Sequence, residues 1–230
     1  MGASATGLIN PAFVLGRAQA SSTPEPVRDG ALIEACALCE VRRFREALGV
    51  LNRVVLSEPS RAEAWTLMTR AHLGRSENAE ALRAARTAGE LSPDSEPHRL
   101  ATIALVALER FDEAADQAAE AVRRDPGDWR NFVEQARALV RIPERLIEAR
   151  VAAQNAVQLA PHKVTPHLVA GQVELAGGEI ESAARAFRQV FTIDPANPNA
   201  YNELARLHLH GGGAKDGGRR RPLLRGRRPR

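Results

Sequence analysis

The sequence predicts an all-α fold in which two-helix units stack side by side into a solenoid, and three observations predict it. The 230 residues are 44% hydrophobic but only 4% aromatic, so the core must be built mainly from Ala, Leu and Val, which suit closely packed helices. The phrase RFDEAADQAAEAVRRDP at residues 110–126 returns in altered form as EIESAARAFRQVFTIDP at residues 179–195. Within both phrases, small and apolar residues recur three and four positions apart, as on one face of an α-helix.

Prolines mark the end of five copies of this phrase, at intervals of 33 to 35 residues: Pro59, Pro93, Pro126, Pro161 and Pro195. An alanine stands 12 residues before each proline, in the order Ala47, Ala81, Ala114, Ala149 and Ala183. Self-similarity at this period indicates a stacked-repeat architecture. One helix pair cannot bury its own apolar faces, so the copies must stack on one another.

The third copy shows how each unit divides into two helices. Residues 111–122 place one set of residues on a single face and most of their acidic residues on the other; the set is Phe111, Ala114, Ala115, Ala118, Ala121 and Val122. This helix must end near Asp125, because the ring of Pro126 disfavours a helical conformation in the residue before it. Residues 98–108 make the preceding helix, and a short turn at 109–110 joins the two. Helices that approach to about 8 Å leave room only for small residues, so the alanines mark the helix crossings.

Both ends of the chain depart from the repeat. Residues 1–27 are predicted to be a flexible leader, because they lack the basic start of a secretory signal and Asn10-Pro11 interrupts their apolar part. Their start, MGASAT, also matches the permissive N-myristoylation pattern. The last 20 residues hold eight Lys or Arg and one Asp, a net +7, which leaves −3 of the total +4 for the rest of the chain. Residues 211–230 are predicted to be a disordered Gly/Arg-rich basic tail, or else a truncated or frame-disrupted end.

A further set of positions connects the repeat to a known family. A bulky residue follows three of the prolines by six positions, namely Trp65, Phe132 and Tyr201. A small residue follows four positions later, namely Thr69, Ala136, Gly171 and Ala205. Together with the columns above, this pattern resembles the tetratricopeptide repeat family over residues 28–210, as five repeats plus the first helix of a sixth. The resemblance implies a right-handed superhelical solenoid that serves as a protein-binding scaffold.

Individual units depart from the family pattern. Arg99 and His167 stand where the bulky residue is expected, and the segment RIPERLIEA lengthens one turn and contains Pro143. These departures affect helix boundaries rather than the architecture.

The resemblance also implies a concave groove, lined by the first helix of each unit, that binds a partner segment. Carried over by repeat position, seven polar residues of this chain are expected in it: Arg70, Arg99, Arg130, Arg137, Gln172, Asn202 and Arg206. The apolar or small residues expected beside them are Leu32, Cys36, Thr66, Ile103 and Leu168. Guanidinium groups match carboxylates in geometry, so the groove is predicted to bind an acidic or C-terminal-carboxylate-bearing segment.

Arginine is also simply the preferred surface cation of this chain, which has 30 Arg and two Lys, and this composition weakens the prediction of a positive groove. Family members that grip chaperone C-termini begin their lysine and asparagine clamp where Leu32 and Cys36 stand here, which disfavours that ligand class. The alternative function is nucleic-acid or anionic-surface binding through the arginine-rich tail.

No motif for catalysis or for a cofactor is found. Cys36 and Cys39 form one C-x-x-C pair, whereas a structural zinc site needs four ligands, and the six histidines make no metal pattern. No apolar run approaches the roughly 20 residues that a membrane-spanning helix needs. The chain is therefore predicted to be a non-enzymatic, cytoplasmic protein without a metal, and two cysteines suit a reducing compartment.

Overall fold

The computed structural model describes residues 26–215, with side-chain surroundings for residues 30–207. Within 26–215 the chain forms eleven α-helices and one short 3-10 helix, and it contains no strand. The elements are α1 (Pro26–Glu40), α2 (Phe44–Ser57), α3 (Ala62–Gly74), α4 (Asn78–Leu91), α5 (Glu96–Ala107), α6 (Phe111–Arg124), α7 (Trp129–Leu139), η2 (Pro143–Arg145), α8 (Leu146–Leu159), α9 (Val164–Ala176), α10 (Ile180–Ile193) and α11 (Pro198–Lys215).

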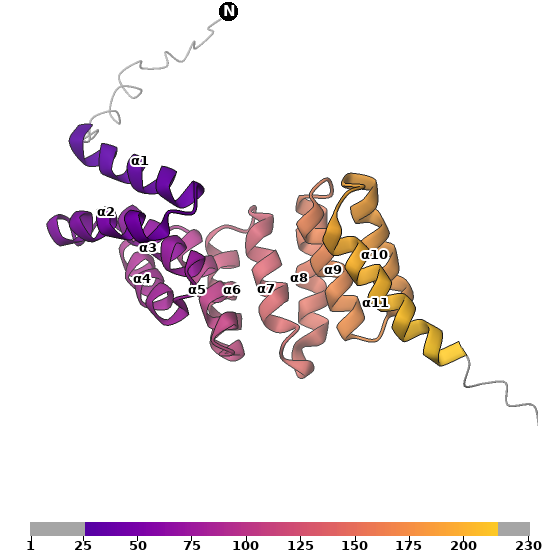
Figure 1. Ribbon diagram of the computed structural model, residues 1–230. Helices are drawn as coiled ribbons and strands as arrows, with labels where there is room; N and C mark the ends of the chain where they lie inside the picture. The colour runs from indigo at the N-terminus through magenta and orange to yellow at the C-terminus, as the bar shows by residue number, and fades with distance from the viewer. Residues whose placement is uncertain (1–25, 216–230) are drawn as a thin grey trace, which may run out of the picture.

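The helices form two layers because each one packs only against near neighbours in the chain. Every helix contacts the next, and α1, α3, α5, α7 and α9 also contact one another in sequence. The odd-numbered helices therefore form one continuous layer, which the even-numbered helices cover from the other side. Figure 1 shows the units following one another along one axis, with α1 and α11 at opposite ends. This arrangement confirms the all-α superhelical solenoid expected from the sequence.

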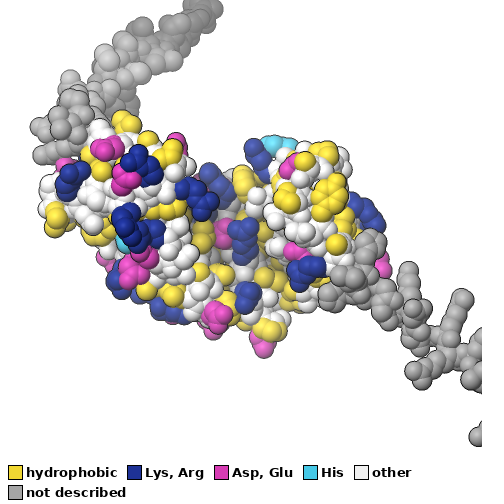
Figure 2. All heavy atoms as spheres, in the orientation of Figure 1, with side chains coloured by type: hydrophobic (Ala, Val, Ile, Leu, Met, Phe, Trp, Pro, Cys, Tyr) yellow, Lys and Arg dark blue, Asp and Glu magenta, His cyan; other side chains and the backbone are white. Residues whose placement is uncertain are grey.

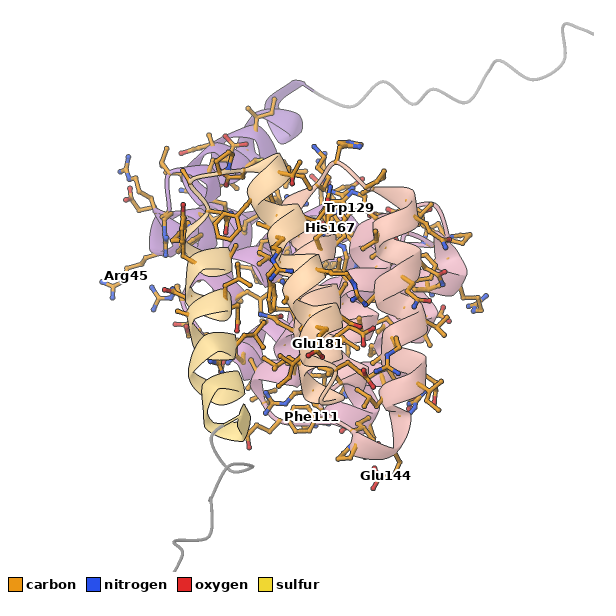
Figure 3. The ribbon with its side chains drawn as sticks, turned by 90° about the vertical axis from the view of Figure 1, so that its right-hand side faces the viewer. Arg45, Phe111, Trp129, Glu144, His167 and Glu181 are labelled. Atoms are coloured by element: carbon orange, nitrogen blue, oxygen red, sulfur yellow. The ribbon has the colours of Figure 1, made fainter. Side chains whose placement is uncertain are left out.

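The turns lie at two opposite edges of the stack (Figure 3). Trp129 and His167, near the starts of α7 and α9, lie at one edge, and Phe111 and Glu144, beside the turns that precede α6 and α8, lie at the other. Turns between units therefore share one edge and turns within units share the other. None of the helices within 26–215 combines the length and hydropathy that a bilayer crossing requires.

The alanines 12 residues before each proline are the centre of the packing, as the repeat predicted. All five are fully buried, namely Ala47, Ala81, Ala114, Ala149 and Ala183. They lie on the even-numbered helices, where a side chain larger than a methyl group would push two helices apart.

We expect Ala114→Leu to lower the free energy of unfolding by about 1–3 kcal/mol, because the added side chain overpacks the contact of α6 with its neighbours. Urea denaturation monitored by circular dichroism measures this change. Ala119→Leu is the matched control, since Ala119 is exposed on the same helix. Equal effects of the two substitutions would contradict the assignment of Ala114 to a helix crossing.

The structure corrects the position of one bulky residue. The Thr69 Oγ1 hydroxyl donates to the carbonyl of Trp65 at 2.9 Å, and the Thr102 hydroxyl donates to the carbonyl of His98 at the same distance. His98, and not Arg99, is therefore the counterpart of Trp65. Alignment on the prolines was wrong here because the bulky position follows Pro93 by five residues, whereas it follows Pro59 by six, so Arg99 stands one residue after the bulky position.

The bulky position also carries a hydrogen bond that the sequence pattern did not reveal. The Trp65 Nε1 group donates to the carbonyl of Pro59 at 2.8 Å, and the Tyr201 hydroxyl donates to the carbonyl of Pro195 at 3.2 Å. The Nε2 atom of His167 lies 2.8 Å from the carbonyl of Pro161. A carbonyl only accepts, so this nitrogen carries the proton. His167 thus preserves the link between helix and turn despite its departure from the family pattern.

The helical segment is longer at both ends than the repeat pattern predicted. Helix α1 begins at Pro26, two residues before the predicted start at 28, and α11 continues to Lys215. Residues 211–215, predicted as part of the tail, are thus helical. The remainder of the predicted leader (1–25) and of the predicted tail (216–230) lies outside the described residues.

Candidate partner groove

The seven polar residues predicted for the groove all lie on odd-numbered helices, and they fall into two groups. Arg70 of α3, Arg99 of α5, and Arg130 and Arg137 of α7 occupy the middle of the stack. The second group is Gln172 of α9 together with Asn202 and Arg206 of α11. Its two helices are joined by Gln172, whose Nε2 atom lies 3.4 Å from Oε1 of Glu203 on α11. We call the surface that carries both groups the odd-helix face.

A shared carboxylate joins the first two arginines. Arg70 Nε donates to Glu96 Oε1 at 3.0 Å, and a second nitrogen of Arg70 also contacts this oxygen. Arg99 reaches the same carboxylate, with an N–O distance of 3.2 Å. Glu96 thereby connects α3 to α5 across the odd-helix face.

The other three arginines each contact a carboxylate on or next to their own helix. Arg130 Nε lies 2.8 Å from Asp128, and Arg137 lies 2.7 Å from Glu134. Arg206 lies 3.1 Å from Glu203. All five arginines predicted for the groove are therefore ion-paired within the described part of the chain.

These carboxylates are the functional residues that the sequence reasoning missed. A signal for three of them was present, because Glu96, Glu134 and Glu203 each stand three residues before a predicted arginine. Residues three apart on a helix are neighbours, so a Glu-x-x-Arg phrase predicts an ion pair. The odd-helix face is consequently a surface of alternating charge instead of a positive one. Figure 2 shows Lys and Arg side chains in separate groups over the middle of one face, with Asp and Glu side chains close by.

Three guanidinium groups in the middle of the stack still reach solvent. The side chains of Arg70, Arg130 and Arg137 are 45%, 58% and 43% exposed, respectively. A guanidinium has five N–H donors, and the bonds described above use only some of them in each case. The remaining N–H groups can bind an incoming anion.

Between α5 and α7 lies a buried carboxyl group. Burial raises the pKa of Glu134, and the nearby charges of Arg137 and Arg99 only partly oppose this rise. Arg99 is itself only 14% exposed, and its Nε atom is buried without a hydrogen-bond partner. These two buried groups of opposite charge thus interact between neighbouring helices of the odd-helix face.

The raised pKa of Glu134 makes stability depend on pH with a definite sign. A carboxyl group whose pKa is higher in the folded than in the unfolded state binds its proton more tightly when folded, so it favours folding as the pH falls through the folded pKa. We expect the free energy of unfolding of the wild-type chain to rise relative to that of Glu134→Gln as the pH is lowered from about 8 to about 4. Urea denaturation across this range measures the difference. Glu63→Gln is the control, because Glu63 is 72% exposed; parallel curves for wild type and Glu134→Gln would contradict the prediction.

A hollow of about 360 Å³ opens between α1, α3 and the start of α5. Its lining includes the predicted inner-face residues Leu32, Cys36, Thr66 and Arg70, which the fold thus brings together. The other lining residues are Ile33, Ala62, Glu63, Leu67, Ser92, Asp94, Glu96 and Pro97. We call this feature the N-terminal hollow.

The two cysteines are both free, and they lie towards the end of α1. Burial raises the pKa of the Cys39 thiol, the neighbouring Cys36 adds to the rise, and Arg70 opposes it. Cys36 lines the N-terminal hollow. In the described part of the chain, no three side chains of His, Cys, Asp or Glu are grouped so that they could hold a metal ion.

Comparison with known proteins agrees with the repeat. The family model described as tetratricopeptide repeat matches residues 34–96 and 168–216. Tetratricopeptide repeat protein 33 of Xenopus laevis is 34% identical over 94 residues, which is 41% of this chain and 36% of that protein. The matched region thus spans about a third of this relative's length.

Solved structures with the same fold cover most of the chain at low sequence identity. TTC0263, a thermophilic TPR protein of Thermus thermophilus, superposes with a TM-score of 0.67 at 16% identity and covers 79% of this chain and 99% of its own. The Cut9–Hcn1 hetero-tetramer of the APC/C matches with a TM-score of 0.70 at 16% identity, over 80% of this chain and 37% of that one. YrrB, described as a TPR protein with an unusual peptide-binding site, matches with a TM-score of 0.58 at 18% identity, over 80% of this chain and 90% of its own.

Proposed function

Because the chain is a tetratricopeptide-repeat protein, we propose that it works as a non-enzymatic scaffold that holds an acidic segment of a partner protein against the odd-helix face, the concave groove of the solenoid. One observation carries the proposal: Arg70, Arg130 and Arg137 present exposed guanidinium groups while carboxylates hold them in place. The proposal places the protein in the cytoplasm, where its two free cysteines stay reduced.

The ion pairs support binding of an anion rather than oppose it. Four guanidiniums in the middle of the stack share three carboxylates of the described chain, those of Glu96, Asp128 and Glu134. An arginine already held by one carboxylate loses less side-chain entropy when a second one binds. The peptide-binding site named for YrrB, which shares the fold, supports a peptide as the partner.

Fluorescence anisotropy with labelled peptides tests this function. A peptide with a run of glutamates among serines is expected to bind the full chain, and a matched lysine peptide is not. The triple variant Arg70→Ser, Arg130→Ser and Arg137→Ser should weaken binding by about tenfold or more, because charge-assisted hydrogen bonds are lost. Arg99 is left unchanged because it is largely buried.

The matched control removes the same charge from the even-numbered helices. The control is the triple variant Arg83→Ser, Arg110→Ser and Arg123→Ser. Arg83 of α4 and Arg123 of α6 are each 72% exposed, and Arg110, in the turn before α6, is 43% exposed. This control should bind the glutamate peptide as wild type does. Equal losses in the two triple variants would show a response to total charge and would overturn the groove assignment.

The basic tail supports a second candidate function, because residues 211–230 carry a net +7. In the full chain, Arg219→Ser, Arg220→Ser and Arg221→Ser should weaken retention on single-stranded RNA and reduce its dependence on salt. Unchanged retention would remove the tail as the nucleic-acid site. Loss of glutamate-peptide binding in this variant would instead move the acidic partner from the groove to the tail.

A further inference from the structure

The N-terminal hollow is an apolar site at one end of the partner groove. Leu32, Ile33 and Cys36 line it from α1, and Leu67 lines it from α3. Ile33 is 69% exposed, so its apolar surface is open to a partner. An apolar concavity of about 360 Å³ is near the lower limit for specific binding sites, and it holds one or two large side chains.

Two acidic side chains beside the hollow add negative charge to this end of the groove. Glu63 is 72% exposed, and its carboxylate lies 3.9 Å from Arg61. The Asp94 carboxylate accepts a hydrogen bond from the Ser92 hydroxyl at 2.7 Å. Glu63 and Asp94 therefore add negative charge beside the Glu96–Arg70 pair. The hollow thus combines an apolar floor with an acidic rim.

We propose that the N-terminal hollow receives a large aliphatic or aromatic side chain of the partner segment, and that a lysine or arginine next to it in that segment pairs with Glu63 and Asp94. This inference rests on the proposed function and extends it, because the same segment continues across α5 to α7 and presents its carboxylates to Arg130 and Arg137. The partner is then a segment in two parts, one apolar and basic, the other acidic.

The spacing of the two parts follows from the packing. Neighbouring packed helices lie about 8–10 Å apart, so the hollow and the α7 arginines are separated by roughly 20 Å. An extended chain advances about 3.3 Å per residue, so about six residues separate the apolar residue from the acidic ones. A continuous segment binds both sites together more tightly than two separate segments would.

Labelled peptides test the two-part segment on the full chain. The complete peptide carries Lys-Leu-Lys at one end, a Gly/Ser spacer of about six residues, and a run of glutamates at the other end, synthesised in both directions. A second peptide has Ser in place of Leu, and a third has Glu in place of the two Lys. In one of its two directions, the complete peptide is expected to bind about tenfold more tightly than the peptide with Ser in place of Leu. It should also bind about tenfold more tightly than the peptide with Glu in place of the two Lys.

Filling the hollow separates this proposal from the proposed function. Thr66 is a half-buried lining residue, and its hydroxyl donates only to the carbonyl of Ala62 on its own helix. In Thr66→Phe the ring should fill the hollow. The variant should therefore lose the tighter binding of the complete peptide but bind the Ser peptide as wild type does. The triple variant Arg70→Ser, Arg130→Ser and Arg137→Ser should weaken binding of both the complete peptide and the Ser peptide. If the Ser and complete peptides bind equally to wild type, the hollow proposal fails while the groove stands. If neither binds, both fail.

Cys36 reports directly on occupancy of the hollow. In Cys39→Ser, Cys36 is the only thiol of the chain, and maleimide labelling followed by mass spectrometry measures its exposure. The complete peptide should slow labelling about tenfold at saturation, and Glu63→Gln with Asp94→Asn should raise the peptide concentration that gives half of this protection. Unchanged labelling would overturn the proposal. Faster labelling of the free chain after Phe13→Ser would also overturn it, since the chain's own leader would then be the occupant.

Discussion

Phe187→Ala is expected to lower the free energy of unfolding by about 3–5 kcal/mol. Phe187 has a relative exposure of 0%, and it is the largest fully buried side chain among those described. Its ring fills the space over Gly171, where a Cβ atom would lie 2.3 Å from a ring carbon. Removal of the ring therefore leaves a cavity that the glycine, which has no side chain, cannot fill.

Urea denaturation of the full chain measures this loss, and the glycine provides an independent check. Gly171→Ala should itself cost about 1–3 kcal/mol, because the new methyl group and the ring cannot occupy the same space. The double variant Gly171→Ala, Phe187→Leu should lose less free energy of unfolding than Gly171→Ala and Phe187→Leu lose in total when each is made alone. Tyr201→Ala is the aromatic control, since Tyr201 is 57% exposed. A strictly additive double variant would contradict the proposed fit of ring and glycine.

Asn131→Asp is expected to destabilise the chain by about 3 kcal/mol or more at neutral pH. Asn131 is fully buried, and its Nδ2 group donates to the carbonyls of Ala121 at 3.2 Å and Asp125 at 3.0 Å. These bonds tie the end of α6 to the start of α7. A carboxylate at this position would face two acceptors without a donor of its own.

The pH dependence distinguishes this mechanism from a general loss of packing. The introduced carboxyl would have a raised pKa in the folded state, so the deficit should shrink as the pH falls and the group gains a proton that it can donate. Asn131→Ala should cost only about 1–3 kcal/mol at any pH, because alanine already fills the corresponding positions 64 and 200. Asn52→Asp, on the exposed side of α2, is the control. A deficit independent of pH would contradict the role assigned to the amide.

The helical repeat was predictable from the sequence because it depends on local rules that every copy states again. The alanine before Pro126 and its four counterparts were found by spacing alone, and all are fully buried. The end of α6 at Arg124 follows from Pro126, as expected. Repetition averages out irregular units, so the departure at His167 did not disturb the prediction of the fold.

The groove was only partly predictable, because its properties depend on pairs of residues from different helices. Spacing placed Arg70 and Arg137 on odd-numbered helices, but it did not reveal that Glu96 links α3 to α5. The neighbourhood of Glu134 depends in the same way on Arg99, which α5 supplies. The binding of an acidic partner by these residues stays a proposal that the peptide experiments test.

By itself, then, the amino-acid order determined which segments are helices, where each one ends, and that neighbouring units must stack to cover their alanine-rich faces. Only the tertiary structure decided which charges face one another, which residue fills the space above Gly171, and where the odd-helix face opens into a hollow. The reason is the range of the forces involved. Helix periodicity and proline geometry act within a few residues of the chain, whereas ion pairing, burial and concavity arise only after separate helices come together.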